Sequence, residues 1–167
     1  MAIVGISLGS NLGDKLLFLQ QAKKELIHLL PAQAQHRQAP IYKTTPIDCP
    51  ENSPDFFNTA IEISYQGTPQ QLLAATQNIE SKIGRKPKIQ LNEPRPIDID
   101  ILYFDDVILK TTQLTLPHPR AHLRRFVLEP LSTICPNRIL PKQNLTILHL
   151  LENLSTTENC LKFLSHW

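Results

Sequence analysis

The clearest alternation of hydrophobic and polar positions lies at residues 97–101, where isoleucine and aspartate take turns. Successive side chains of a strand point to opposite faces, so the pattern predicts a strand whose isoleucines face a core. Asp98 and Asp100 then share the other face, about 6–7 Å apart along the strand. Two such carboxylates suit a bound cation, because each raises the cost of ionising the other. The simpler interpretation is an edge strand with a solvated acidic face.

The pattern before this strand predicts two strand–helix units. Strands are expected at 2–8, 34–43 and 57–65, and helices at 14–30 and 68–83. Gly9-Ser10-Asn11 is expected to be a turn after the first strand. With the aspartate strand, the order becomes β-α-β-β-α-β, which is the ferredoxin-like arrangement. We therefore expect an α+β sandwich, in which a largely antiparallel sheet carries these two helices on one face.

Beyond residue 104 the pattern predicts additions to this fold. A turn at Asp105 and Asp106 should lead to a hairpin return at 107–109, and a short strand is expected at 114–116. C-terminal helices are predicted at 120–131 and 146–151. A chain of 167 residues without internal repeats is expected to form one domain, residues 1–167.

Composition and charge narrow the class of protein. The chain is 41% hydrophobic and 19% charged, which is typical of a globular domain, and its net charge of +2 is too small to favour nucleic acid or a membrane surface. The three cysteines are far apart and lack zinc-site spacing, which favours reduced thiols. The N-terminus resembles a strand rather than a signal peptide, and no stretch is long enough to span a membrane. We expect a soluble, cytoplasmic protein.

Cations near the two aspartates favour a chemical role over a solvated edge. Arg95 immediately precedes the aspartate strand, and a segment rich in Arg and His follows at 116–126. Mg²⁺ takes oxygen ligands and shares them with substrate phosphates, while cationic side chains offset phosphate charge. Together with Arg85, His118 and Arg124, the two aspartates form a set suited to phosphoryl transfer.

Element order alone does not decide function, because many activities share this fold. An RNA-binding RRM needs exposed aromatics in a K/R-G-F/Y-G/A-F-V-x-F/Y stretch, and the sequence has none. A metal carrier of this fold would show CxxC, and a P-loop enzyme would show GxxxxGK[ST]. Neither motif is present.

Four motifs between residues 9 and 126 resemble those of the 6-hydroxymethyl-7,8-dihydropterin pyrophosphokinase family. They are Gly9-Ser10-Asn11, Phe56-Phe57-Asn58, Pro94-Arg95-Pro96-Ile97-Asp98-Ile99-Asp100-Ile101, and Pro117-His118 with Arg124 and Phe126. The PRxxDxD run followed by PH is specific to this family. The resemblance implies an enzyme of folate biosynthesis that transfers the β,γ-pyrophosphate of ATP to the hydroxymethyl group of a reduced pterin and leaves AMP.

The resemblance also implies roles for individual residues. Asp98 and Asp100 would hold two Mg²⁺ ions, while Arg85 and Arg95, which flank a mobile loop, would neutralise charge during catalysis. The positions implied in ATP binding are Gln77, Glu80, Arg85, Lys88, Arg95, Ile101, Thr115, His118 and Arg124. Those implied in pterin binding are Thr44, Pro46, Ile47, Phe56, Asn58 and Phe126, with the pterin stacked between the two phenylalanines.

The chain departs from the commonest family pattern at a few positions. Phe56 stands where many members carry tyrosine, which preserves stacking but removes a hydroxyl. Positions that are often basic or aromatic in the family carry Pro87, Leu91, Asn92 and Pro119. Neither the pattern nor the resemblance assigns a role to Arg120, His122 and Arg125, which we expect at the surface.

These observations together predict a monomeric, Mg²⁺-dependent pyrophosphoryl transferase whose partners are the small molecules ATP and hydroxymethyl-dihydropterin. The alternative is a non-catalytic regulatory domain that binds a nucleotide or a pterin on the same fold. Formation of AMP distinguishes the two, because a binding module would take up both ligands without producing any.

Overall fold

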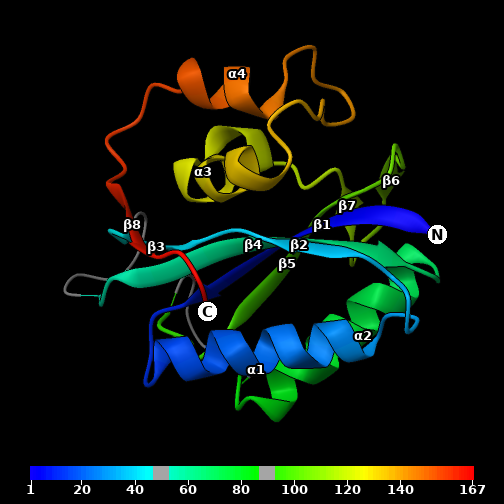
Figure 1. Cartoon of the computed structure of the whole chain (residues 1–167), viewed down its shortest axis with the longest axis horizontal. Coiled ribbons are helices and arrows are strands. Elements are labelled where there is room, and N and C mark those ends of the chain that lie inside the picture. The colour runs from blue at the N-terminus through cyan, green and yellow to red at the C-terminus, as the bar shows by residue number, and fades with distance from the viewer. Residues whose placement is uncertain (47–52, 87–92) are drawn as a thin grey trace.

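The computed structural model describes residues 1–46, 53–86 and 93–167, and a six-stranded antiparallel sheet forms its centre (Figure 1). The strands are β1 (Ala2–Ser10), β2 (His36–Gln38), β3 (Ile41–Thr44), β4 (Phe56–Tyr65), β5 (Asp98–Phe104) and β8 (Cys160–Leu164). Their order is β5-β1-β4-β3-β8, and β2 also pairs with β4. The first and last strands of the β-α-β-β-α-β unit are thus neighbours, and the predicted ferredoxin-like fold is confirmed.

Helices cover both faces of this sheet. Helices α1 (Lys15–His28) and α2 (Pro69–Lys82) lie on one face, and α3 (Arg125–Ile134) and α4 (Ile147–Glu152) lie over the other (Figure 1). Each side has its own hydrophobic cluster: the three isoleucines of residues 97–101 belong to the first, and Leu102 and Tyr103 to the second. The two helices of the repeated unit share one face as expected, and the C-terminal helices form a third layer.

Local capping residues begin both helices of this face. The carboxylate of Asp14 accepts a hydrogen bond from the N–H of Leu17 at 3.1 Å and begins α1. Thr68 forms a capping box with Gln71 at the start of α2, and Pro69 occupies the first helical position. Gly84, with φ of +100°, follows the end of α2, where glycine is the residue that most readily adopts this conformation.

The predicted strand at 34–43 is wrong in its continuity, because β2 and β3 are separate short strands. Pro40 lies between them and has no N–H to donate to a sheet ladder. The predicted helix at 120–131 is likewise broken. A 3₁₀ turn at Ala121–Leu123 precedes Arg124, whose extended backbone (φ −122°, ψ 120°) delays the start of α3 to Arg125.

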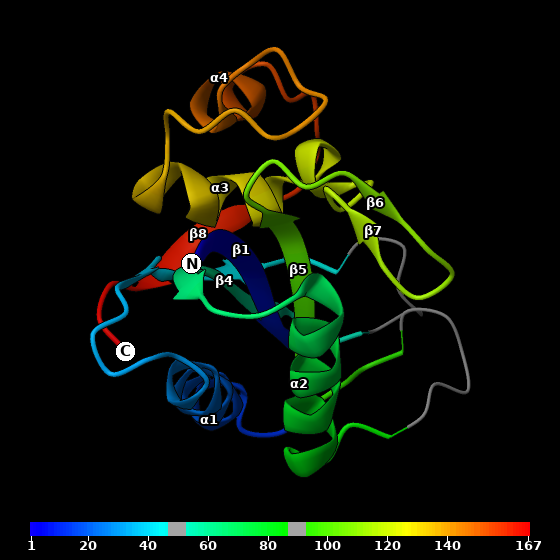
Figure 2. The same cartoon turned by 90° about the vertical axis from the view of Figure 1, so that its right-hand side faces the viewer.

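The predicted hairpin return at 107–109 is wrong in its partner. Residues Leu109–Lys110 form β6, which pairs with β7 (Thr115–Leu116) in a separate two-stranded sheet rather than with β5. This hairpin lies beside β5, at the sheet edge away from β8 (Figure 2). The predicted turn after β5 is present, and the carboxylate of Asp105 accepts the N–H of Ile3 at 2.7 Å.

The segment after α4, which carries no sequence motif, is part of the sheet. Its strand β8 pairs with β3, and the indole N–H of Trp167 donates to the carbonyl of Ala39 at 2.8 Å. Every helix in the described part of the chain is too short or too polar to cross a lipid bilayer.

Gly5→Ala should lower the free energy of unfolding by about 1–3 kcal/mol, because a Cβ at this position would overlap the ring of Tyr103. Gly5 lies on β1 between Tyr103 of β5 and Glu62 of β4, and the Tyr103 hydroxyl donates to Glu62 at 2.6 Å across it. Urea denaturation of the two single variants, Gly5→Ala and Tyr103→Phe, and of the double variant measures the coupling. Strict additivity would show that the glycine does not support this hydrogen bond.

Candidate active site

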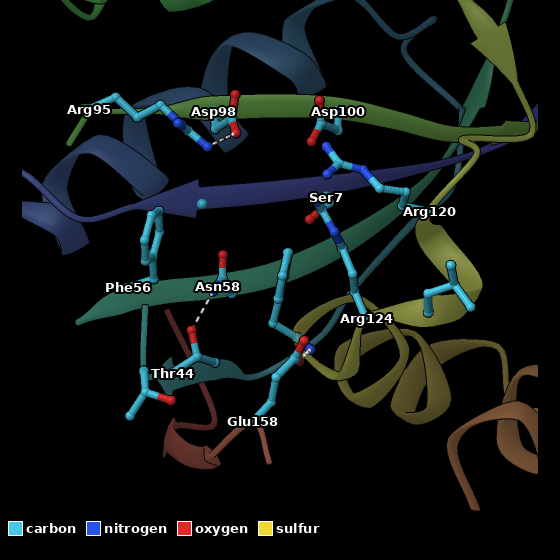
Figure 3. Close-up of a pocket in the computed structure, with 14 residues that line it drawn as sticks. Ser7, Thr44, Phe56, Asn58, Arg95, Asp98, Asp100, Arg120, Arg124 and Glu158 are labelled. Carbon is cyan, nitrogen blue, oxygen red and sulfur yellow. Dashed lines mark hydrogen bonds and ion pairs between the residues drawn. The ribbon is translucent and has the colours of Figure 1, made fainter. Parts of the chain in front are cut away.

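A cavity of about 300 Å³ opens between the sheet and the start of α3 (Figure 3). The strand register builds its floor in two rows. In one row Gly9 of β1 lies between Asn58 of β4 and Asp98 of β5, and in the next Ser7 lies beside Asp100. A Cβ on Gly9 would lie 2.7 Å from Oδ1 of the Asn58 side chain. Glycine therefore keeps the floor open at this point.

The predicted turn at residues 9–11 is wrong in position, because β1 continues through Ser10. Asn11 follows and holds the main chain of Arg95: its Oδ1 accepts the Arg95 N–H at 2.9 Å, and its N–H donates to the Arg95 carbonyl at 3.2 Å. The first motif therefore supplies a glycine to the cavity floor and fixes the arginine that precedes β5.

Asp98 is the centre of a largely buried charge cluster at one end of the cavity. Its Oδ1 lies 2.5 Å from Arg85 Nη1, and its Oδ2 lies 2.7 Å from Arg95 Nη2. Arg85 also pairs with Glu80 of α2, whose carboxylate accepts the N–H of Ile99 at 2.7 Å. These contacts join α2, β5 and the segment before β5 through charged groups.

Asp100 lies in the same cavity, on the same face of β5 as Asp98. Burial, with the charge of Asp98 as the next cause, raises the pKa of Asp100 to about 6, although Arg124 and Arg95 oppose this shift. Arg120 lines the same cavity as this carboxylate (Figure 3). Burial also raises the pKa of Glu80 to about 7, against the opposing charge of Arg85. Burial is thus the main reason why the ionised forms of Asp100 and Glu80 are disfavoured.

The two aspartates fit a metal ion that completes its coordination with other oxygens. Among the described residues, no three or more His, Cys, Asp or Glu side chains are grouped so that they could hold a metal by themselves. Mg²⁺ commonly binds one or two carboxylates and takes its other ligands from water and substrate phosphates. Burial disfavours the ionised form of Asp100, and a bound cation would stabilise that form.

The other end of the cavity combines aromatic rings with one buried amide. The Asn58 side chain is only 4% exposed, and its Nδ2 donates to Thr44 Oγ1 at 2.7 Å, so its carbonyl oxygen remains for the cavity (Figure 3). Phe56 and Phe126 also line the cavity. The Arg95 guanidinium lies 5.9 Å from the centre of the Phe56 ring, and that of Arg124 lies 5.2 Å from Phe126. Cations therefore adjoin both aromatic rings.

The structure brings eight of the predicted site residues into this cavity. They are Thr44, Phe56, Asn58, Arg95, Asp98, Asp100, Arg124 and Phe126. Arg85 and Glu80 lie behind Asp98 and contact it directly or through one another. Ile47 and Lys88 lie outside the described residues, as does most of the predicted mobile loop.

Five other predicted residues do not line the cavity: Pro46, Gln77, Ile101, Thr115 and His118. The side chain of Ile101 is buried in the hydrophobic core, and that of Gln77 is exposed on α2. Burial, with Arg124 as the next cause, lowers the pKa of His118 to about 4, and its Nδ1 accepts the N–H of Arg120 at 3.2 Å. His118 therefore shapes the segment that carries the cavity-lining arginines.

Sequence reasoning missed several residues that line the cavity. Val4, Ile6 and Leu8 alternate along β1 and are buried on one face, so Ser7 belongs to the opposite face, which lines the cavity. A polar residue within an otherwise apolar strand was a usable signal. Arg120, expected at the surface without a role, lines the cavity although it stays exposed. Leu123 and Glu158 also lie there, and no local pattern marks them. Thr45, which lies between the predicted positions Thr44 and Pro46, lines the cavity as well. Arg125 is a surface residue that pairs with Glu129 at 3.0 Å.

Comparisons with known proteins agree with this geometry. The family model for 7,8-dihydro-6-hydroxymethylpterin-pyrophosphokinase (HPPK) matches residues 5–136. A 2-amino-4-hydroxy-6-hydroxymethyldihydropteridine pyrophosphokinase of Bacillus subtilis is 41% identical over 133 residues, which are 80% of this chain and 78% of that protein. The enzyme of the same name from a Synechocystis strain is 34% identical over 158 residues, which are 93% of this chain and 77% of that one.

A solved HPPK-DHPS structure from Plasmodium falciparum shares the fold, with a TM-score of 0.69 and 15% identity. The match covers 90% of this chain but only 43% of the Plasmodium chain. This likeness supports the fold alone, whereas the family match and the closer relatives decide the family. The chain therefore belongs to the 7,8-dihydro-6-hydroxymethylpterin pyrophosphokinase family, whose reaction is pyrophosphoryl transfer from ATP to hydroxymethyldihydropterin in folate biosynthesis.

Proposed function

We propose that this chain carries out its family's reaction as a Mg²⁺-dependent enzyme, with both reacting groups in the cavity described above. The observation that supports this most is that one cavity contains both groups suited to phosphates and groups suited to a flat heterocycle. The first are a pair of aspartates with nearby arginines, and the second are a buried amide and two phenylalanine rings. The proposal also keeps the expectations of a single catalytic domain, residues 1–167, and of a monomer.

The aspartate end is proposed to bind the phosphates of ATP. Asp98 and Asp100 would hold Mg²⁺, which when bound supplies positive charge to the phosphate oxygens and orients them. Arg85 and Arg95 pair with Asp98. Arg95, Arg120 and Arg124 are then close enough to bind phosphate oxygens and stabilise the charge that develops as the phosphoryl group transfers.

The aromatic end is proposed to bind the pterin. Phe56 and Phe126 offer faces for a flat heterocycle, and the Asn58 carbonyl can accept from the N–H groups along its polar edge. Asn58 and Asp98 lie one strand to either side of Gly9, so their backbones are about 10 Å apart across the sheet. A pterin held by Asn58 can therefore direct its hydroxymethyl group at the phosphates, and this orientation lowers the barrier to transfer.

The positions proposed for the rest of ATP rest on the family resemblance. They are Gln77, Glu80, Lys88, Ile101, Thr115 and His118. Glu80 has a clear structural task as well, because it links α2 to β5 through Ile99 and to Arg85. Pro46 and Ile47 remain proposals on the pterin side for the same reason.

Purified protein with ATP and Mg²⁺ should release AMP only when 6-hydroxymethyl-7,8-dihydropterin is added. Asp98→Asn and Asp100→Asn should each lower this turnover by about two orders of magnitude or more, and the double variant should lose far less than the two effects combined. Both carboxylates would serve one metal–phosphate cluster. Uptake of both ligands by the wild type without AMP would instead favour a regulatory binding domain.

The same two variants should differ in stability without ligands. Asp98→Asn removes the carboxylate that pairs with both Arg85 and Arg95 and leaves Arg85 with Glu80, which should cost about 2–4 kcal/mol. Asp100→Asn should leave the melting temperature unchanged or raise it, because it removes a carboxylate that burial and Asp98 already disfavour. Equal melting temperatures for the two variants would argue against the charge cluster around Asp98.

Asn58→Ala should weaken pterin binding at least about tenfold while leaving ATP binding unchanged, because a buried hydrogen bond to the ring is lost. Thr44→Val is a matched variant that keeps the side-chain size but removes the acceptor that orients the amide. It should weaken pterin binding less than Asn58→Ala does and should also leave ATP binding unchanged. Calorimetry with each ligand measures both affinities, and an equal loss for ATP would mean that Asn58 supports only the fold.

Arg120→Ala should raise the KM for ATP about fivefold, because it removes one proposed cationic contact to phosphate from an exposed position. Arg125→Ala is the matched control, since Arg125 pairs with Glu129 on the surface and does not line the cavity. Steady-state kinetics with saturating pterin compare the two. A KM for ATP that stays at the wild-type value in Arg120→Ala would remove this residue from the phosphate site.

A further inference from the structure

The segment that precedes β8 crosses the aromatic end of the cavity. The carbonyl of Asn159 accepts the N–H of Thr45 at 3.3 Å, and Cys160 pairs with Thr44 in the sheet. Glu158 therefore stands next to the anchored strand, and its side chain lines the cavity (Figure 3). This segment lies beyond residues 5–136, the part of the chain that the family model matches.

Glu158 supplies a hydrogen bond that α3 lacks at its own start. The residue before the helix, Arg124, makes no side-chain capping bond. The carboxylate of Glu158 instead accepts the N–H of Phe126 at 3.1 Å, across 32 positions of sequence. The first N–H groups of a helix have no partner within it, and an anionic acceptor there satisfies one of them and complements the helix dipole.

The cap is itself held in place. The Glu158 N–H donates to the Thr156 hydroxyl at 3.1 Å, while β8 and Trp167 fix the chain that follows to β3 and Ala39. A carboxylate on such a support can define where α3 begins. Arg124 and Phe126 both depend on that point, because one precedes the first turn and the other lies in it.

We propose that Glu158 is a positioning residue for the pterin site: it fixes the start of α3 and thereby sets the orientation of Phe126 and Arg124. This inference rests on the proposed function for its consequence, the affinity for pterin, but the cap itself does not. The pterin site is then completed by the C-terminal segment as well as by the motifs between residues 9 and 126.

Glu158→Ala should weaken binding of 6-hydroxymethyl-7,8-dihydropterin about fivefold, the effect expected from losing one helix cap. Glu158→Gln should stay close to the wild type, because its amide carbonyl can still accept the Phe126 N–H. The matched control is Thr146→Ala, which removes the corresponding cap of α4, where the Thr146 hydroxyl accepts the His149 N–H at 3.2 Å away from the cavity. It should lower the melting temperature similarly without changing pterin affinity.

Hydrogen exchange of the Phe126 amide tests the helix cap independently of its consequence for pterin affinity. Exchange should accelerate in Glu158→Ala and not in Thr146→Ala, whether or not pterin binds. Wild-type exchange or wild-type pterin affinity in Glu158→Ala would overturn the positioning role, as would an equal loss of pterin affinity in Thr146→Ala. If the wild type binds no pterin, yet the Phe126 amide exchanges faster in Glu158→Ala than in the wild type, the proposed function and the consequence for affinity are overturned while the cap stands.

Discussion

The ion pairs of Asp98 are the interaction on which the site depends most. A carboxylate with little exposure to water is costly unless cations and hydrogen bonds compensate it. Here Arg85 pairs with one oxygen of Asp98 and Arg95 with the other, and Glu80 extends the cluster to α2. The cluster therefore fixes the start of β5 relative to α2. It also holds two arginine side chains beside the place where phosphate is proposed to bind.

Strand register turns this cluster into a cavity. Because β1 lies between β4 and β5, its residues Gly5, Ser7 and Gly9 each have one neighbour on β4 and one on β5. Gly9 leaves room between Asn58 and Asp98, and Gly5 leaves room for the ring of Tyr103. Space on one face of the sheet thus results from the absence of side chains at Gly5 and Gly9 of β1. On the other face of β1, Val4, Ile6 and Leu8 are completely buried, which holds the register.

The third layer gives the cavity its remaining wall. Arg124 interrupts the helical segment, so that the 3₁₀ turn and α3 present Arg120, Leu123 and Phe126 to the same space. The C-terminal segment then returns to the sheet edge and adds Glu158. A sandwich with helices on one face would leave the charged and aromatic groups of β4 and β5 open to solvent. The additions enclose them, which strengthens electrostatic interactions and excludes water from phosphoryl transfer.

The sequence by itself determined the order of elements, the caps of α1 and α2, and the alternation that places Asp98 and Asp100 on one face, because these depend on residues close together in the chain. Its motifs also indicated the family, and with it eight residues of the cavity. Only the tertiary structure showed that Arg120 lines the cavity, that β6 pairs with β7, and that Glu158 caps α3. A cap 32 positions away from its helix leaves no periodic signal. Such contacts are decided by how layers pack, since a hydrogen bond across them depends on three-dimensional position rather than on spacing along the chain.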